Sequence, residues 1–205
     1  MLAQRVVDWG MGNGLMQEEN MATGNNNVTP EMASFARRCA AESCVLLKND
    51  GTLPLQKENQ VAVFGRCQVD WFYVGYGSGG DVHPPYRVNL MEGLVNAGVA
   101  FDKDLAKVYD DWCNSEDNKA YHGWWGHWPM SHPEMPLEQD VVSGAAKRCD
   151  TAIVVIGRAA GEDRENTLTP GSYYLTEQEI DMLDQVTTAF QHTVVLMNAG
   201  NIIDM

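Results

Sequence analysis

The sequence predicts a layered α/β sandwich with a mostly parallel central sheet. Three short apolar runs, at 60–65, 151–157 and 192–200, have the composition of strands that are buried on both faces. Segments of helical period lie between them. This alternation of buried strands and amphipathic helices is typical of a parallel sheet that helices cover, so we expect an α/β fold.

The composition is that of one globular domain. Hydrophobic residues make up 44% of the 205 residues and charged residues 20%, which is ordinary for a protein with a single core. The formal net charge of −14 repels phosphates and anionic lipid headgroups, so nucleic acids and membranes are poor candidates for partners. We therefore expect a neutral ligand.

The cysteines and the N-terminus bear on the compartment. The five cysteines are an odd number and form no Cys-x-x-Cys pair, which disfavours a zinc site and predicts reduced thiols. The first residues lack the unbroken apolar core of a signal peptide, and no apolar run approaches the roughly 20 residues of a membrane span. We expect a cytoplasmic protein without cofactor or metal, although an incomplete N-terminus could conceal an export signal.

The chain begins with an irregular segment and a helix. Residues 1–28 are rich in Gly, Asn and Met and show no sustained period, so we interpret them as a lead-in to a domain at 29–205. The first helix has Thr29 as N-cap, a proline in its first turn, and an apolar face that includes Phe35 and Val45–Leu46. An Asp-Gly turn and a proline follow it.

The middle of the chain contains two long loops. A glycine-rich loop at 71–86 follows the first buried strand, and a tryptophan loop at 118–136 carries three tryptophans among glycines, histidines and prolines. Between these loops, the pattern predicts a helix at 89–96, a second strand at 98–103 and a helix at 104–117.

The last third repeats the strand and helix pattern. A helix at 137–148 precedes the most apolar strand, at 151–157. The helix that follows extends to residue 190, and Thr176 with Glu179 forms the pattern of a capping box at its start. The strand at 192–200 completes the predicted sheet.

An acidic loop follows the most apolar strand and contains Gly-Glu-Asp-Arg-Glu-Asn, with Glu162, Arg164 and Glu165. Ligands of parallel sheets bind outside the carboxyl ends of the strands, where this loop lies. A carboxylate there can be partly desolvated, and the raised pKa that results suits a general acid. A solvated charged loop with Arg164 paired internally fits the same pattern, so composition alone leaves both interpretations open.

Gly75, Gly77 and Gly80 match the Gly-x-Gly-x-x-Gly fingerprint of dinucleotide-binding domains. The context does not fit, because the motif lies well beyond the strand and prolines block the helix that should follow. We instead expect a turn that needs unusual backbone angles or a close approach to a ligand. A nucleotide-binding domain is the less favoured alternative.

The tryptophan loop suggests a sugar site more readily than a metal site. His122, His127 and His132 recur every five residues, whereas ligand pairs on helices lie three or four apart, so we do not expect zinc. Trp124 and Trp125 could stack on sugar rings, or the tryptophans could cover a small satellite core. A serine hydrolase has no local support, because no serine lies in a Gly-x-Ser-x-Gly elbow.

Four long segments between Ala33 and Met205 resemble the α/β-sandwich domain of glycoside hydrolase family 3, which includes β-glucosidases and β-xylosidases. Their ranges are 40–55, 61–94, 151–183 and 194–205. The resemblance implies hydrolysis of terminal β-linked sugars with retention of configuration. In this family, an aspartate on a TIM barrel is the nucleophile, and a glutamate on a loop of the α/β domain is the acid/base.

The resemblance also suggests roles for individual residues. The acid/base position of relatives with a Gly-Glu loop matches Glu162, which we favour over Glu165. Two residues are suggested to orient this loop, Asp163 and Arg164, and two to line the entrance for the leaving group, Tyr76 and Asp81. The substrate-binding residues that we expect are Tyr76, Asp81, Trp124, Trp125 and Arg164.

Two departures from the family pattern limit what this chain is expected to do alone. The barrel with its nucleophile is missing, and Asp8-Trp9-Gly10, despite a likeness to a barrel element, has no barrel around it. The chain also stops where relatives continue. We expect a truncated chain or fragment that is inactive without a TIM-barrel partner; the alternative is a non-catalytic carbohydrate-binding or interaction module. Neither the sugar nor the oligomeric state follows from the sequence.

Overall fold

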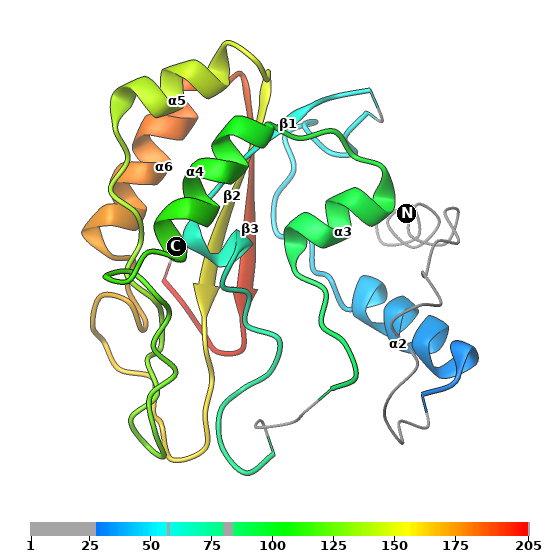
Figure 1. The fold of residues 1–205 in the computed structure, drawn as a ribbon, viewed down its shortest axis with the longest axis vertical. Helices are drawn as coiled ribbons and strands as arrows, with labels where there is room; N and C mark the ends of the chain where they lie inside the picture. The colour runs from blue at the N-terminus through cyan, green and yellow to red at the C-terminus, as the bar shows by residue number, and fades with distance from the viewer. Residues whose placement is uncertain (1–27, 57, 80–83, 205) are drawn as a thin grey trace.

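The computed structural model describes residues 28–56, 58–79 and 84–204, in which helices lie on both sides of a central sheet (Figure 1). The predicted lead-in, except for its last residue, lies outside this part of the chain, as does Asp8-Trp9-Gly10. Within the described residues, no helix is both long enough and apolar enough to cross a lipid bilayer.

The sheet has three parallel strands in the order β1-β2-β3. They are β1 at Val61–Phe64, β2 at Thr151–Arg158 and β3 at His192–Ala199. The first residues of the three strands pair with one another. Every residue of β1 and β2 is buried, as their apolar composition predicts, and the α/β fold class with a parallel sheet is confirmed.

The helices begin where the sequence places capping residues. Thr29 accepts a hydrogen bond from a backbone N–H of the first turn, Asn89 forms a capping box, and the capping box predicted at Thr176 and Glu179 is present. The remaining elements are α2 at Pro30–Glu42, the 3-10 helix η2 at Arg66–Gln68, α3 at Leu90–Ala97, α4 at Lys103–Cys113, α5 at Gln139–Ala146 and α6 at Glu177–Ala189.

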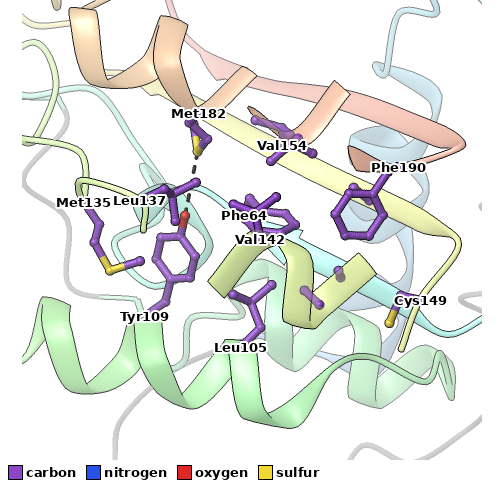
Figure 2. Close-up of a cluster of buried hydrophobic side chains, with 14 of the residues drawn as sticks. Phe64, Leu105, Tyr109, Met135, Leu137, Val142, Cys149, Val154, Met182 and Phe190 are labelled. Atoms are coloured by element: carbon purple, nitrogen blue, oxygen red, sulfur yellow. Dashed lines mark hydrogen bonds between the residues drawn. The ribbon is translucent and has the colours of Figure 1, made fainter. Parts of the chain in front are cut away.

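The larger core lies between the sheet and helices α4, α5 and α6 (Figures 1 and 2). The ring of Phe64 on β1 meets that of Phe190, at the end of α6, edge to face with centroids 5.5 Å apart. The hydroxyl of Tyr109 on α4 donates to the sulfur of Met182 on α6 over 3.7 Å. These contacts place the three helices in one layer against β1 and β2.

The opposite face of the sheet is covered more thinly. There, Leu94 of α3 packs with Val63 and Val155, which alternate with the side chains of the larger core. No residue of β3 is fully buried, and the side chain of Val195 is 46% exposed. The central strand β2 is therefore the best-covered part of the sheet, and it leads directly into the acidic loop.

The strand predicted at 98–103 is wrong except for one bridge, between Phe101 and Val61. The Asp102 side chain accepts hydrogen bonds from the backbone N–H groups of Asp104 and Leu105, at 3.1 and 3.2 Å. An N-cap at this position starts α4 and stops the extended segment after a single paired residue.

The first helix is shorter than predicted. It ends at Glu42, where the N–H of Ser43 bonds to the carbonyl of Cys39. None of its residues is buried, and the predicted apolar face is largely exposed, with Phe35 59% and Val45 79% accessible. Nothing within the described residues covers that face, so the amphipathic pattern is correct as a helix signal but not as a core signal.

Candidate functional site

Three loops meet beyond the carboxyl ends of the strands, at the lower end of the molecule in Figure 1. They are the glycine-rich loop, described at 71–79 and 84–86, the tryptophan loop at 118–136 and the acidic loop at 159–166. The first of these loops follows the strand β1 and the third follows β2, at the edge of a parallel sheet where ligands bind.

The glycine-rich loop and the acidic loop are joined through their backbones. The N–H of Tyr76 donates to the carbonyl of Ala160 over 2.7 Å, and the N–H of Glu162 donates to the carbonyl of Tyr76 over 3.0 Å. Tyr76 and Gly161 thus form an isolated parallel bridge. This bridge joins the segments that follow β1 and β2 and lies apart from the paired strands themselves.

The tryptophan loop closes the arrangement from a second side. The ring of Tyr76 stacks on that of Trp128, with centroids 5.6 Å apart and an interplanar angle of 2°. The guanidinium Nε of Arg164 donates to the carbonyl of Trp128 over 2.8 Å, and the indole N–H of Trp125 donates to Asp163 over 3.2 Å. Arg164 therefore joins the acidic loop to the tryptophan loop.

Two buried carboxylates fasten these loops to the core. Glu134 accepts the N–H of Arg66 at 2.8 and 3.0 Å and that of Met135 at 2.8 Å, and burial raises the pKa of Glu134 to about 7. Behind the acidic loop, Arg158 and Glu179 form a bidentate ion pair at 2.6 and 2.7 Å with both side chains buried. The loops consequently rest on a rigid base.

Glu162 lies on the exposed rim of this arrangement. Its Oε2 accepts two hydrogen bonds from Ser78, one from the hydroxyl at 2.6 Å and one from the backbone N–H at 2.9 Å. These donors lower the pKa of Glu162. The expectation of a desolvated carboxyl with a raised pKa is wrong for this chain, because Glu162 is exposed and its hydrogen bonds favour the ionised form.

The glycine-rich loop approaches the acidic loop so closely that side chains would not fit. A Cβ at Gly77, whose φ is +109°, would lie 2.5 Å from the Cβ of Glu162, and a Cβ at Gly75 would lie 3.1 Å from the carbonyl oxygen of Ala160. The two glycines therefore serve contact between loops, in agreement with the turn that we expected in place of a dinucleotide site. Gly80 lies outside the described residues.

A pocket of about 610 Å³ opens between the glycine-rich loop and the tryptophan loop. Residues 71–78 form one wall, and Trp125, Trp128 and His122 contribute to the other. This volume lies in the range of small-molecule sites, and the aromatic lining suits the apolar face of a sugar ring.

The predicted site residues are only partly brought together. Tyr76 and Trp125 line the pocket, whereas Trp124 stacks on His127 and is 62% exposed. Glu165 is exposed on the same loop as Glu162. Asp81 lies outside the described residues.

Two of the three histidines, His122 and His132, line the same pocket. His127 packs on Trp124, and His132 stacks on Phe72 with centroids 5.2 Å apart. Among the residues that the structure describes, no group of three His, Cys, Asp or Glu side chains is placed to hold a metal ion.

Sequence reasoning missed Ser78 and Glu134. Each acts on a partner far along the chain, Ser78 on Glu162 and Glu134 on Arg66. A hydroxyl within a glycine-rich loop and a lone carboxylate in an apolar stretch were the available signals. Neither signal identifies its partner without the fold.

Comparison with known proteins supplies the family. A family model described as "Glycosyl hydrolase family 3 C-terminal domain" matches residues 44–205. A β-glucosidase from Ruminococcus albus is 44% identical over 175 residues, which is 85% of this chain and 18% of that protein.

Two solved structures are similar in fold as well as in sequence. A β-glucosidase from Paenibacillus barengoltzii superposes with a TM-score of 0.72 at 44% identity, covering 78% of this chain and 17% of that one. β-Glucosidase 3B from Thermotoga neapolitana, in complex with α-D-glucose, superposes with a TM-score of 0.73 at 30% identity, covering 88% and 26%. This chain thus spans about a sixth to a quarter of the length of these relatives and belongs to glycosyl hydrolase family 3, its residues 44–205 matching the C-terminal domain of that family.

Proposed function

We propose that this chain is the part of a retaining β-glucosidase that supplies Glu162 as general acid/base. The observation that carries the proposal is the position of Glu162, at the end of the fully buried strand β2 and beside an open, aromatic-lined pocket. The relatives named β-glucosidase support the reaction class and suggest glucose as the sugar. The nucleophile, an aspartate on a TIM-barrel domain, comes from another part of the enzyme.

The reaction has two steps, and Glu162 serves in both. In the first, Glu162 gives its proton to the leaving oxygen while the bond from C1 to that oxygen breaks and a bond from C1 to the nucleophile forms. In the second, the Glu162 carboxylate takes a proton from water, whose oxygen attacks C1 and releases the nucleophile. Glu162 ends protonated, ready for the next cycle.

The separate domain cannot complete this cycle. Glu162 is exposed and its pKa is lowered, so it is ionised near neutrality and faces no nucleophile within the described residues. A barrel packed against the three loops would remove water from the carboxyl, and desolvation raises the pKa of a carboxylic acid. We therefore expect no turnover by this chain alone.

The neighbouring residues divide between orientation and substrate binding. Arg164 and Asp163 hold the tryptophan loop, Arg164 through the carbonyl of Trp128. Tyr76 and Trp125 line the pocket, where their rings suit stacking on the leaving group. Trp124 and Asp81 are proposed as outer contacts to a longer substrate.

A chimera tests the assignment. This chain replaces the aligned segment of the Ruminococcus albus β-glucosidase, with which it shares 44% identity, and aryl β-glucoside hydrolysis is measured. Glu162→Gln should reduce kcat/KM for a substrate with a poor leaving group by at least about 100-fold, the typical minimum contribution of a general acid. Glu165→Gln is the matched control and should retain activity. Loss of activity in the control with retention in Glu162→Gln would overturn the assignment.

A carbohydrate-binding module without catalysis is the second candidate, because the pocket and the exposed Trp124 suit sugar binding without any contribution from Glu162. Calorimetric titration of this chain with glucose and cellobiose distinguishes the two. Two results together would favour the module. This chain with Glu162→Gln would still bind the sugars, and the chimera with Glu162→Gln would stay fully active.

A further inference from the structure

Ser78 is the residue of the glycine-rich loop that touches the Glu162 carboxylate. Both of its donors, the hydroxyl at 2.6 Å and the backbone N–H at 2.9 Å, bond to the same oxygen, Oε2. The other carboxylate oxygen, Oε1, has no part in these two bonds, and Glu162 as a residue is exposed. Ser78 thus holds the carboxylate through one of its two oxygens.

The backbones of the two loops lie close together around the contact between Ser78 and Glu162. The bridge between Tyr76 and Gly161 fixes the distance between the two loops on one side, and the contact of Gly77 with Glu162 leaves no room for a Cβ. Ser78 follows Gly77 directly, so its backbone N–H is placed by the same loop segment that forms the bridge, and its hydroxyl bonds to the same oxygen of Glu162. The backbone of the glycine-rich loop therefore positions one of the two donors, and the side chain adds the second.

We propose that Ser78 is a positioning residue, whose hydroxyl and N–H hold the Glu162 carboxylate in the place and charge state that a general base needs. This inference rests on the proposed role of Glu162. It adds to that role a residue that stabilises one protonation state of Glu162. The two steps of a retaining hydrolysis need opposite protonation states of the same carboxyl. Ser78 favours the state needed in the second step.

The physical basis is the stabilisation of a negative charge by hydrogen-bond donors. Donors to a carboxylate favour its ionised form, and the hydroxyl and N–H of Ser78 are the largest causes of the lowered pKa of Glu162. The other charged or titratable side chains on the described parts of the three loops are Tyr73, Tyr76, Tyr86, Lys119, Tyr121, His122, His127, His132, Glu134, Asp163, Arg164 and Glu165. Each of these acts on the Glu162 pKa less than Ser78 does.

Titration of Glu162 in this chain tests the contact without any catalysis. The carboxyl carbons of glutamate are labelled with ¹³C, Glu162→Gln assigns the resonance, and the midpoint is followed by NMR. Ser78→Ala should move the midpoint to higher pH, and Ser78→Thr, which keeps a hydroxyl, should restore it. Ser143→Ala is the control, because Ser143 lies on α5 and its hydroxyl bonds to the carbonyl of Asp140 within the same stretch of chain, far from Glu162 in the sequence. An unchanged midpoint in Ser78→Ala would overturn the proposal.

Kinetics of the chimera test the consequence for the two steps. With an alkyl β-glucoside, whose departure needs a protonated acid, Ser78→Ala should extend kcat/KM to higher pH. With a dinitrophenyl β-glucoside, whose turnover depends on the base step, the same variant should lose kcat on the acidic side. A structural defect would lower both rates and leave the two limbs of the pH profiles in place.

Failure of this inference and failure of the proposed function give different results. If Ser78→Ala leaves the NMR midpoint unchanged, Ser78 has no such role even where Glu162→Gln abolishes activity. If Glu162→Gln leaves the chimera active, the acid/base assignment is wrong even where the midpoint moves. Should Ser78→Ala fail to fold, Ser78→Cys takes its place, because a thiol is a weak donor and predicts the same upward shift.

Discussion

Replacing Glu134 by glutamine should change how the stability of the chain depends on pH. The Glu134 carboxyl fastens the tryptophan loop to the end of β1, and burial raises its pKa from 4.5 to about 7. A group whose folded-state pKa exceeds its unfolded value holds its proton more tightly in the folded chain. The stability it contributes is fully present below pH 4.5 and is lost as the pH rises to about 7.

The size of the stability loss follows from the interval between the unfolded-state and folded-state pKa values of Glu134. Each pH unit between the two pKa values is worth about 1.4 kcal/mol, so the wild-type chain should lose on the order of 3 kcal/mol between pH 4.5 and pH 7 relative to the variant. A glutamine at 134 is neutral at every pH, and its carbonyl oxygen can still accept one of the backbone N–H bonds. The unfolding free energy of the variant should therefore lack the decrease with pH that Glu134 causes in the wild-type chain.

The assay is urea unfolding of both chains at a series of pH values from 4.5 to 7.5. A second buried group makes the comparison with a variant necessary. Burial lowers the pKa of His132 from 6.5 to about 4, so the stability it contributes is lost as the pH falls through that range. The two groups act in opposite directions and partly cancel in the wild-type curve. A constant difference between the two unfolding free energies across the series would refute this account of Glu134.

Three further predictions concern the core and the loops. Glu179→Gln leaves the buried guanidinium of Arg158 without its charge partner and should lower the unfolding free energy by about 3 to 5 kcal/mol in urea; a loss below about 1 kcal/mol would contradict the role of this pair. Phe190→Ala should cost about 3 kcal/mol and lower the Tm, and an unchanged Tm would mean that the larger core does not depend on this ring. Gly77→Ala should displace the acidic loop and shift the NMR midpoint of Glu162, while a midpoint equal to that of the wild type would show that the loops tolerate a Cβ.

Local signals in the sequence predicted most of the fold. The capping box at Thr176 acts within four residues, and the apolar strand at 151–157 needs no knowledge of its neighbours to be recognised. The strand expected at 98–103 failed because a competing local signal, the N-cap at Asp102, starts the next helix first. The prediction that the side of the first helix with Phe35 is buried failed for another reason, since an amphipathic pattern does not say whether any segment of the chain covers its apolar face.

The sequence led to a candidate loop but not to its chemistry. The strand-end rule led to the acidic loop, and the resemblance to glycoside hydrolase family 3 led to Glu162 within it, yet the charge state expected there was wrong. That state depends on Ser78, and the support of the tryptophan loop depends on the buried Glu134. Such pairings exist only after the sheet has brought distant segments together, so no local pattern reveals them.

The bridge between the two loops also bears on how the site forms. Ser78 and Glu162 lie 84 positions apart in the chain, and they meet because β1 and β2 pair in parallel. Closing such a long segment costs conformational entropy before any contact compensates for it, which makes non-local parallel pairing slow. Since the bridge between Tyr76 and Gly161 joins the loops that follow these two strands, the site should form only once the strands have paired, and a chain with unpaired strands would have no remnant of the site.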